Sequence, residues 1–145
     1  MPLDVSAGDT ITVAITQQSS GVWLIVIRDS ANEQSWQNTI SYKSSRSSAE
    51  WIEEAPAEDQ HTIVPLDRFG AITFTAGSTV ENGQTCTVAQ AGGQPITMAN
   101  SLGQALAQPS ALGADSASFT VTRTNVSAPR PAPGIGNFPF SERLP

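Results

Sequence analysis

Two stretches near the amino terminus, TITVAIT at residues 10–16 and VWLIVIR at residues 22–28, decide the expected fold. In the first, Ile11, Val13 and Ile15 alternate with small or polar residues, which predicts a strand with one buried face and one polar face. The second is continuously apolar, which favours a strand in the middle of a sheet with both faces covered. Both stretches therefore predict β structure.

The rest of the sequence repeats short strand signals separated by turn residues. The connecting stretch RDSANEQSW, residues 28–36, is rich in Asp, Ser and Asn, whose side chains form turns by bonding the nearby backbone. We therefore expect the strands at 22–28 and 35–42 to pair as a hairpin. Further strands are expected at 49–54, 71–75, 85–89, 96–99 and 118–123. This pattern predicts an all-β fold, an antiparallel β-sandwich.

The length of 145 residues fits one domain with its own core. We expect residues 1–124 to form it. Residues 125–145 concentrate Pro and Gly without a period, which predicts a disordered tail. The one helical pattern, at 101–108, is short and bounded by Gly103 and Pro109, so a strand or loop is expected there instead.

The composition excludes several function classes. The 7 Lys and Arg against 13 Asp and Glu give a net charge of -6, so no basic surface is expected to bind nucleic acid. The single Cys86 cannot form an intrachain disulfide, and the single His61 cannot build a multi-histidine zinc site. No metal or cofactor is expected. The low charged content of 14% fits an acidic environment, because few native carboxylates would be protonated there.

No membrane segment is expected in this sequence. The first ten residues, MPLDVSAGDT, contain neither a basic stretch nor an apolar run, so they predict no signal peptide and no anchor. The longest apolar run, at residues 22–27, is far shorter than the roughly 20 residues that span a bilayer.

Acidic residues collect in one segment with a strand pattern, SSAEWIEEAP at residues 47–56. On a strand, Glu50, Ile52 and Glu54 share one face, opposite to Glu53. The α-carbons of Glu50 and Glu54 would then lie roughly 13 Å apart, which excludes an aspartic-protease-like pair that shares a proton. Spacing alone favours a simpler interpretation, in which the glutamates are solvated charges that keep an edge strand from aggregating.

Four segments in series carry a family resemblance. They are VSAGDTITVAIT (residues 5–16), AEWIEEAP (49–56), PLDRFGAITFTAG (65–77) and ITMANSLGQALAQPSALGADSASFTVT (96–122). Their order and motifs resemble the glutamic peptidases, the eqolisin or peptidase G1/A4 family, in the bacterial form without disulfides. The resemblance extends from about Asp4 to Thr124.

The resemblance implies two packed, curved antiparallel sheets, similar to concanavalin or a jelly roll, and an endopeptidase acting on polypeptides at acidic pH. Position by position, Glu54 matches the catalytic glutamate, which activates a water and then protonates the leaving amine. A secreted location is expected from the family.

The catalytic glutamine of the family belongs to a strand before the segment that resembles residues 4–16, and this sequence has no counterpart of it. Gln17 and Gln18 occupy a different position, so the role is not transferred to them. The sandwich is expected to be incomplete at its amino terminus. A truncated gene, a missing amino-terminal half on another chain, or a paralogue that binds without cleaving would each account for this.

Two other functions stay open from the residues alone. One is a non-catalytic β-sandwich that binds a carbohydrate or a protein, with Trp23, Trp36 or Trp51 either in a groove or in sheet packing. The other is a glycosidase, which needs a second carboxylate about 5 to 9.5 Å from Glu54. Asp59 and Asp67 would be the candidates for that second group.

Overall fold

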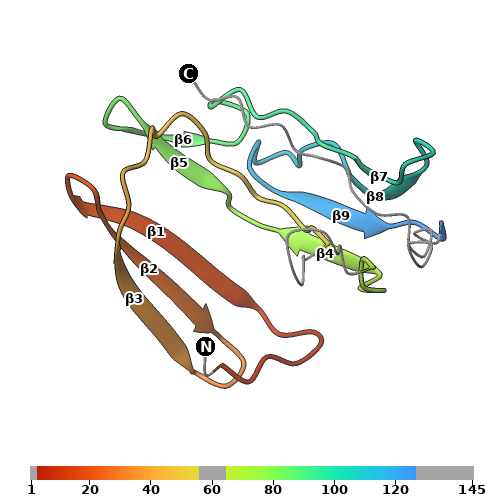
Figure 1. Ribbon diagram of the computed structural model, residues 1–145, viewed down its shortest axis with the longest axis horizontal. Helices are drawn as coiled ribbons and strands as arrows, with labels where there is room; N and C mark the ends of the chain where they lie inside the picture. The colour runs from red at the N-terminus through yellow and green to blue at the C-terminus, as the bar shows by residue number, and fades with distance from the viewer. Residues whose placement is uncertain (1–2, 56–64, 127–145) are drawn as a thin grey trace, which may run out of the picture. The chain divides into compact units, whose positions relative to one another are not determined.

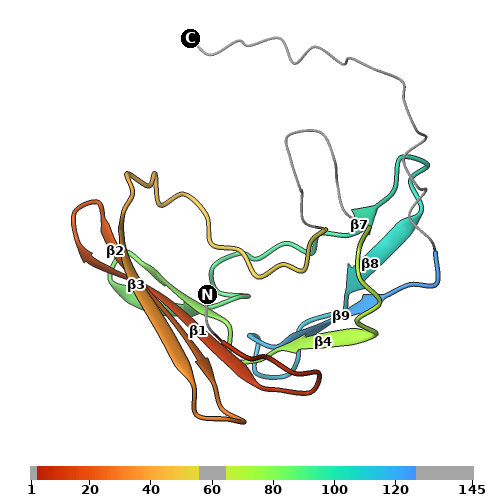
Figure 2. The same cartoon turned by 60° about the horizontal axis from the view of Figure 1, so that its bottom comes forward.

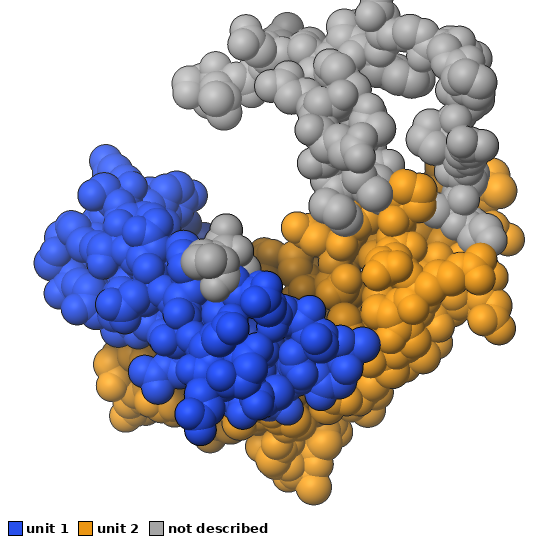
Figure 3. All heavy atoms as spheres, turned by 90° about the horizontal axis from the view of Figure 1, so that it is seen from below, with its two compact units in different colours: residues 1–48 blue, residues 49–145 orange. Residues whose placement is uncertain are grey.

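The structure, a computed structural model, describes residues 3–55 and 65–126. These residues form nine strands and no helix (Figure 1), which confirms the all-β prediction. The chain forms two compact units, unit 1 at residues 1–48 and unit 2 at residues 49–145 (Figure 3). The predicted tail lies outside the described residues from 127 onward, as do Asp59 and His61. Because the described part contains no helix, it contains no helix able to cross a membrane.

Unit 1 is a three-stranded antiparallel sheet. Its strands are β1 (Ile11–Ser19), β2 (Val22–Asp29) and β3 (Ser35–Ser41), in the order β1-β2-β3. The central place of β2 agrees with its continuous apolar sequence, and its pairing with β3 confirms the predicted hairpin. The β1–β2 connection turns through Gly21, whose φ of 71° is a conformation that glycine adopts without steric cost.

The apolar face of this sheet is exposed, although the sequence predicted that it is buried. Val13 pairs with Ile27 and Ile15 with Ile25, so these four side chains share one face. Val13 is nevertheless 58% exposed and Ile15 64% exposed. The alternation correctly identifies the apolar face, but β1 is an edge strand and the described part of unit 1 contains no second layer. The prediction of burial for this face is therefore wrong.

The β2–β3 turn is built as its composition predicted. Oδ1 of Asp29 accepts a hydrogen bond from the backbone N–H of Ala31 at 2.8 Å, and Oδ1 of Asn32 accepts one from the N–H of Gln34 at 2.9 Å. Each side chain bonds the backbone two residues further on, which is the usual way in which Asp and Asn form turns. These bonds fix the hairpin loop at one end of the sheet.

Unit 2 contains a four-stranded antiparallel sheet and a separate hairpin. The sheet order is β4-β9-β8-β7, and Figure 2 shows β4 beside β9. Its strands are β4 (Ala71–Phe74), β7 (Met98–Ala99), β8 (Ala105–Pro109) and β9 (Phe119–Arg123), while β5 (Ser78–Glu81) pairs with β6 (Gln84–Thr87). Region 101–108 therefore contributes a strand, one of the two outcomes expected for it. The strand at 78–81 was not predicted.

The core of unit 2 lies on this four-stranded sheet. It consists of Leu66, Leu106, Ala107 and Val121, each at most 7% exposed. The rings of Phe74 and Phe119 stack beside it with their centroids 5.0 Å apart. Unlike unit 1, unit 2 thus has a buried apolar cluster formed by its own residues.

Arg123, at the end of β9, ties three backbone segments of unit 2 together. Nη1 of its guanidinium donates to the carbonyl oxygens of Leu106 at 2.8 Å, Thr124 at 2.9 Å and Val126 at 2.9 Å. Its Nε donates to the carbonyl oxygen of Asp67 at 3.3 Å. Because Nη1 carries two hydrogens, one of them is shared between two of these carbonyl oxygens, and the N–H of Nε serves the fourth oxygen. The chain before β4 is therefore fixed to the end of β9.

Candidate active site

The acidic segment at residues 49–55 is not a strand, contrary to the prediction for 49–54. Among the described residues it pairs with no other strand, and alternation of side chains alone does not supply a hydrogen-bonded neighbour. Burial still alternates along it: Trp51, Glu53 and Ala55 are half-buried, while Glu50, Ile52 and Glu54 are exposed. The predicted division of the glutamates between two sides is therefore confirmed.

Two apolar contacts fix this segment on unit 2. Ala55 packs against the core of unit 2. Trp51 lies beside Gly77, where a Cβ atom would be 3.5 Å from Cε2 of the indole and 2.9 Å from Cγ2 of Val88. A residue larger than glycine at position 77 would force Val88 to shift, whereas it would meet the indole at an ordinary van der Waals distance. Glu53 and Glu54 are thus positioned between two anchors four residues apart.

Two carboxyl groups of unit 2, those of Asp67 and Glu54, act on a third, that of Glu53. Burial raises the pKa of Glu53, and the negative charges of Asp67 and Glu54 raise that pKa further. Desolvation and like charges both disfavour the ionised form, so the three effects act in the same direction. The structure therefore brings together two neighbours in the sequence, Glu53 and Glu54, with a residue that lies more than a dozen positions away.

Neighbouring residues and hydrogen bonds fix the position of Asp67. The preceding residue, Leu66, is 5% exposed and belongs to the core, while the carbonyl oxygen of Asp67 accepts the hydrogen bond from Arg123. Its Oδ1 accepts a hydrogen bond from the backbone N–H of Arg68 at 2.7 Å. Both the backbone and the carboxylate of Asp67 are therefore held in place.

This arrangement is suited to proton transfer. Glu54 is exposed, so water and a substrate can reach its carboxylate. Glu53 keeps its proton to a higher pH than an ordinary glutamate. Within residues 3–55 and 65–126, no group of three or more His, Cys, Asp or Glu side chains is arranged to hold a metal ion. Asp67 acts on Glu53, whereas Asp59, the other possible glycosidase partner, lies outside the described residues.

The sequence indicated Glu54 but not the other members of this group. The alternation of side chains along the acidic segment placed Glu53 opposite to Glu50 and Glu54, on the side that is half-buried in the structure. A buried side was reason enough to expect a raised pKa for Glu53. Asp67 could not be found in this way, because its approach to Glu53 depends on how the chain folds between them. Glu50 lies on the exposed side with Glu54.

Comparison with known proteins identifies the family. The profile of the peptidase A4 family matches residues 1–123, a range that includes the whole acidic segment. The chain belongs to the peptidase A4 family. This family member is also similar to the crystal structure of aspergilloglutamic peptidase from Aspergillus niger, with a TM-score of 0.72 and 25% sequence identity. That match covers 85% of this chain and 71% of the other chain.

A comparison with curated proteins found no match. The structural similarity to a glutamic peptidase confirms the predicted fold class, an antiparallel β-sandwich. For this peptidase A4 family member, the family and the fold support a relationship to peptidases.

Proposed function

We propose that this protein hydrolyses peptide bonds and that Glu54 is the general base that activates the attacking water. The observation that carries the proposal is the peptidase A4 match over residues 1–123, which contains the AEWIEE segment with Glu54 at its end. Two features support it: Glu54 is exposed, and the segment is anchored on both sides by Trp51 and Ala55. A fixed, accessible carboxylate is what such a base requires.

In the proposed reaction, the carboxylate of Glu54 takes a proton from a water molecule while the water oxygen bonds to the scissile carbonyl carbon. The carboxyl then returns this proton to the leaving nitrogen as the C–N bond breaks. Glu53 assists indirectly. Because its pKa is raised, it is neutral over more of the acidic range than an ordinary glutamate, and a neutral neighbour repels the ionised Glu54 less.

The tetrahedral intermediate also needs a hydrogen-bond donor for its oxyanion. We propose that a glutamine supplied by polypeptide outside the sequence given, either upstream or on another chain, fills this role. The loss of one such donor costs about 10²- to 10³-fold in rate in well-studied hydrolases. The isolated chain is therefore expected to be far less active than a protein that contains the donor.

The test compares two conservative variants of the longest reading frame that contains this chain with the unmutated protein. Cleavage of a denatured protein is measured from pH 2 to pH 7, roughly the range in which carboxyl groups titrate. Glu54→Gln should lower kcat by about 10²- to 10⁴-fold, because an amide cannot accept the proton. Glu50→Gln is the matched control, since Glu50 is exposed on the same side of the segment and should keep near-normal activity.

An unchanged rate for Glu54→Gln would show that the assignment of the base is wrong. If the folded, unmutated protein cleaves nothing at any pH, the alternative function becomes the better one, a β-sandwich that binds a ligand without hydrolysing it. The thermal unfolding of each variant is compared, so that loss of activity is not confused with loss of the fold.

A further inference from the structure

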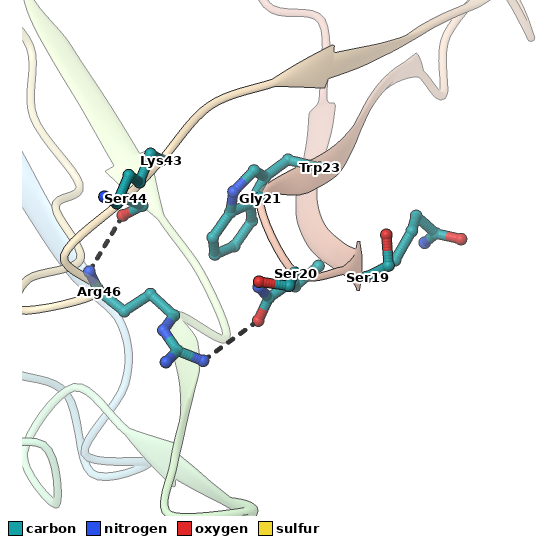
Figure 4. A pocket seen from close by; sticks show the side chains of 9 residues that line it. Ser19, Ser20, Gly21, Trp23, Lys43, Ser44 and Arg46 are labelled. Atoms are coloured by element: carbon teal, nitrogen blue, oxygen red, sulfur yellow. Dashed lines mark hydrogen bonds between the residues drawn. The ribbon is translucent and has the colours of Figure 1, made fainter.

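Unit 1 contains an open pocket of about 690 Å³, whose lining ends at Arg46, just before the acidic segment (Figure 4). One wall is formed by the end of β1 and the β1–β2 turn, including Gln17 and Ser20, and the other by the segment that follows β3, including Lys43 and Arg46. Trp23 lies between these walls. The pocket is large enough for several residues of a ligand, because small-molecule sites typically occupy about 300 to 1,000 Å³.

The charge of this pocket differs from that of the whole chain. The protein has a net charge of -6 and only 7 Lys and Arg, yet the lining contains two of these cations and no acidic residue. Both Lys43 and Arg46 are exposed. Two neighbouring cations without an acidic partner in the lining attract an anionic group.

The cationic wall is held in place by three hydrogen bonds. The indole Nε1–H of Trp23 donates to the carbonyl oxygen of Tyr42 at 3.0 Å, which fixes the ring beside the segment after β3. Arg46 has a φ of 56°, and its backbone N–H donates to Oγ of Ser44 at 3.0 Å. Its Nη1 reaches Oε1 of Gln17 across the pocket at 3.4 Å. This last bond is long, so the guanidinium can exchange it for a better acceptor.

We propose that this pocket binds an acidic segment of polypeptide. A carboxylate of the segment pairs with Arg46 and Lys43, since the planar guanidinium matches the two oxygens of a carboxylate. Adjoining apolar atoms lie on the indole of Trp23, and the side-chain amide of Gln17 is available to the peptide backbone. The inference rests on the proposed function only in taking a polypeptide as the ligand, because the binding itself involves no catalytic residue.

The test is equilibrium binding of a fluorescent peptide, measured by anisotropy at pH 6 with the full chain. The probe is a peptide with three consecutive Asp residues beside a Leu, and its partner probe has Asn in place of each Asp. The double variant Lys43→Gln with Arg46→Gln should weaken binding of the Asp peptide by at least about tenfold, because both cations that pair with the carboxylate are lost. The unmutated chain should bind the Asn peptide no more tightly than the double variant binds the Asp peptide.

The matched control is Arg28→Gln, which removes one exposed cation of the same unit outside this pocket. It should change the affinity less than about twofold, because only long-range attraction is lost. If Arg28→Gln weakens binding as much as the double variant, or if both peptides bind equally, the proposal is overturned. Competition by inorganic phosphate alone at the peptide's own concentration would also overturn it, by showing that the pocket is a simple anion site.

The catalytic proposal and this one fail separately. Glu54→Gln should bind the Asp peptide as tightly as the unmutated chain, because Glu54 lies outside the pocket lining. An active protein that does not bind the probe would overturn only the binding proposal. Binding should also weaken as the pH falls below about 4, because the peptide carboxylates take up protons.

Discussion

The two units of this protein differ in how far the apolar side chains of their sheets are buried. Unit 2 covers its four-stranded sheet with Leu66, Leu106 and other residues of its own. In unit 1, Ile15 of β1 is 64% exposed on the apolar face of the three-stranded sheet. The difference teaches that a clear apolar pattern and a buried face are separate properties. Unit 2 holds the acidic segment on a core of its own, whereas the apolar side chains of β1 in unit 1 stay exposed.

The largest test of this comparison is a matched pair of truncations, Leu106→Ala in unit 2 and Ile15→Ala in unit 1. Leu106 is 6% exposed, so its truncation leaves a cavity and should lower the free energy of unfolding by about 2 to 5 kcal/mol. Ile15→Ala should cost less than about 1 kcal/mol, because much of its side chain is already in water. Denaturant unfolding of both variants measures the difference. Equal losses would mean that the apolar face of unit 1 is covered in solution.

A second, smaller effect is expected at the anchor of the acidic segment. Gly77→Ala places a methyl group 2.9 Å from Val88 and 3.1 Å from the carbonyl oxygen of Ala117, which should cost about 1 to 3 kcal/mol through overpacking. Because Trp51 lies at the same point, peptide hydrolysis should fall as well. Ser78→Ala, at the exposed neighbouring position, serves as the control and should leave the melting temperature nearly unchanged. An unchanged melting temperature for Gly77→Ala would contradict the close packing of Gly77 against Val88 and Ala117.

The smallest expected effect concerns the pH dependence of unit 2. The pKa of Glu53 is raised by burial and by the charges of Asp67 and Glu54, so the folded protein binds this proton more tightly than the unfolded chain does. The stabilisation is therefore complete below the unfolded value of 4.5 and is lost as the pH rises through the folded pKa. Replacing Glu53 with Gln should remove this dependence. Since Glu53 is only half-buried, the gain at pH 7 should be a few tenths of a kcal/mol.

Thermal unfolding of Glu53→Gln and the unmutated chain, followed between pH 3 and pH 8, measures that difference. The two should be equally stable at the acidic end and diverge above it. Glu50→Gln is the control, because Glu50 is exposed. A Glu53→Gln variant that is less stable at neutral pH would show that the carboxylate makes a favourable contact.

Local patterns in the sequence predicted the local part of the fold. The apolar run of β2 and the Asp and Asn side chains after it were enough to predict the β2–β3 hairpin. The β5–β6 hairpin was predictable too, because Asn82 and Gly83 stand at its turn with φ of 51° and 80°. An Asn-Gly pair between strands is a strong hairpin signal. Only the strand after this turn was predicted.

The remaining features depend on contacts between distant residues. The alternation at residues 49–54 predicted which glutamates share a side, but it could not supply a partner strand. The approach of Asp67 to Glu53 also depends on the folded chain. So does the fact that apolar side chains are buried on the sheet of unit 2 but exposed on the sheet of unit 1. The role proposed for Glu54 came from family resemblance, whereas the pocket with Lys43 and Arg46 became visible only in three dimensions.

The hydrogen bonds of Arg123 carry a consequence for the order of folding. They join β9 to backbone 17 and 56 residues earlier in the chain, while the strands of unit 1 are connected by short turns. Contacts between distant residues require closure of long loops and form slowly, whereas local hairpins form fast. We therefore expect the sheet of unit 1 to exist, with its apolar face still in water, before the core of unit 2 is complete. During synthesis, a chaperone would then bind the exposed apolar face of unit 1, the part of the chain that folds first.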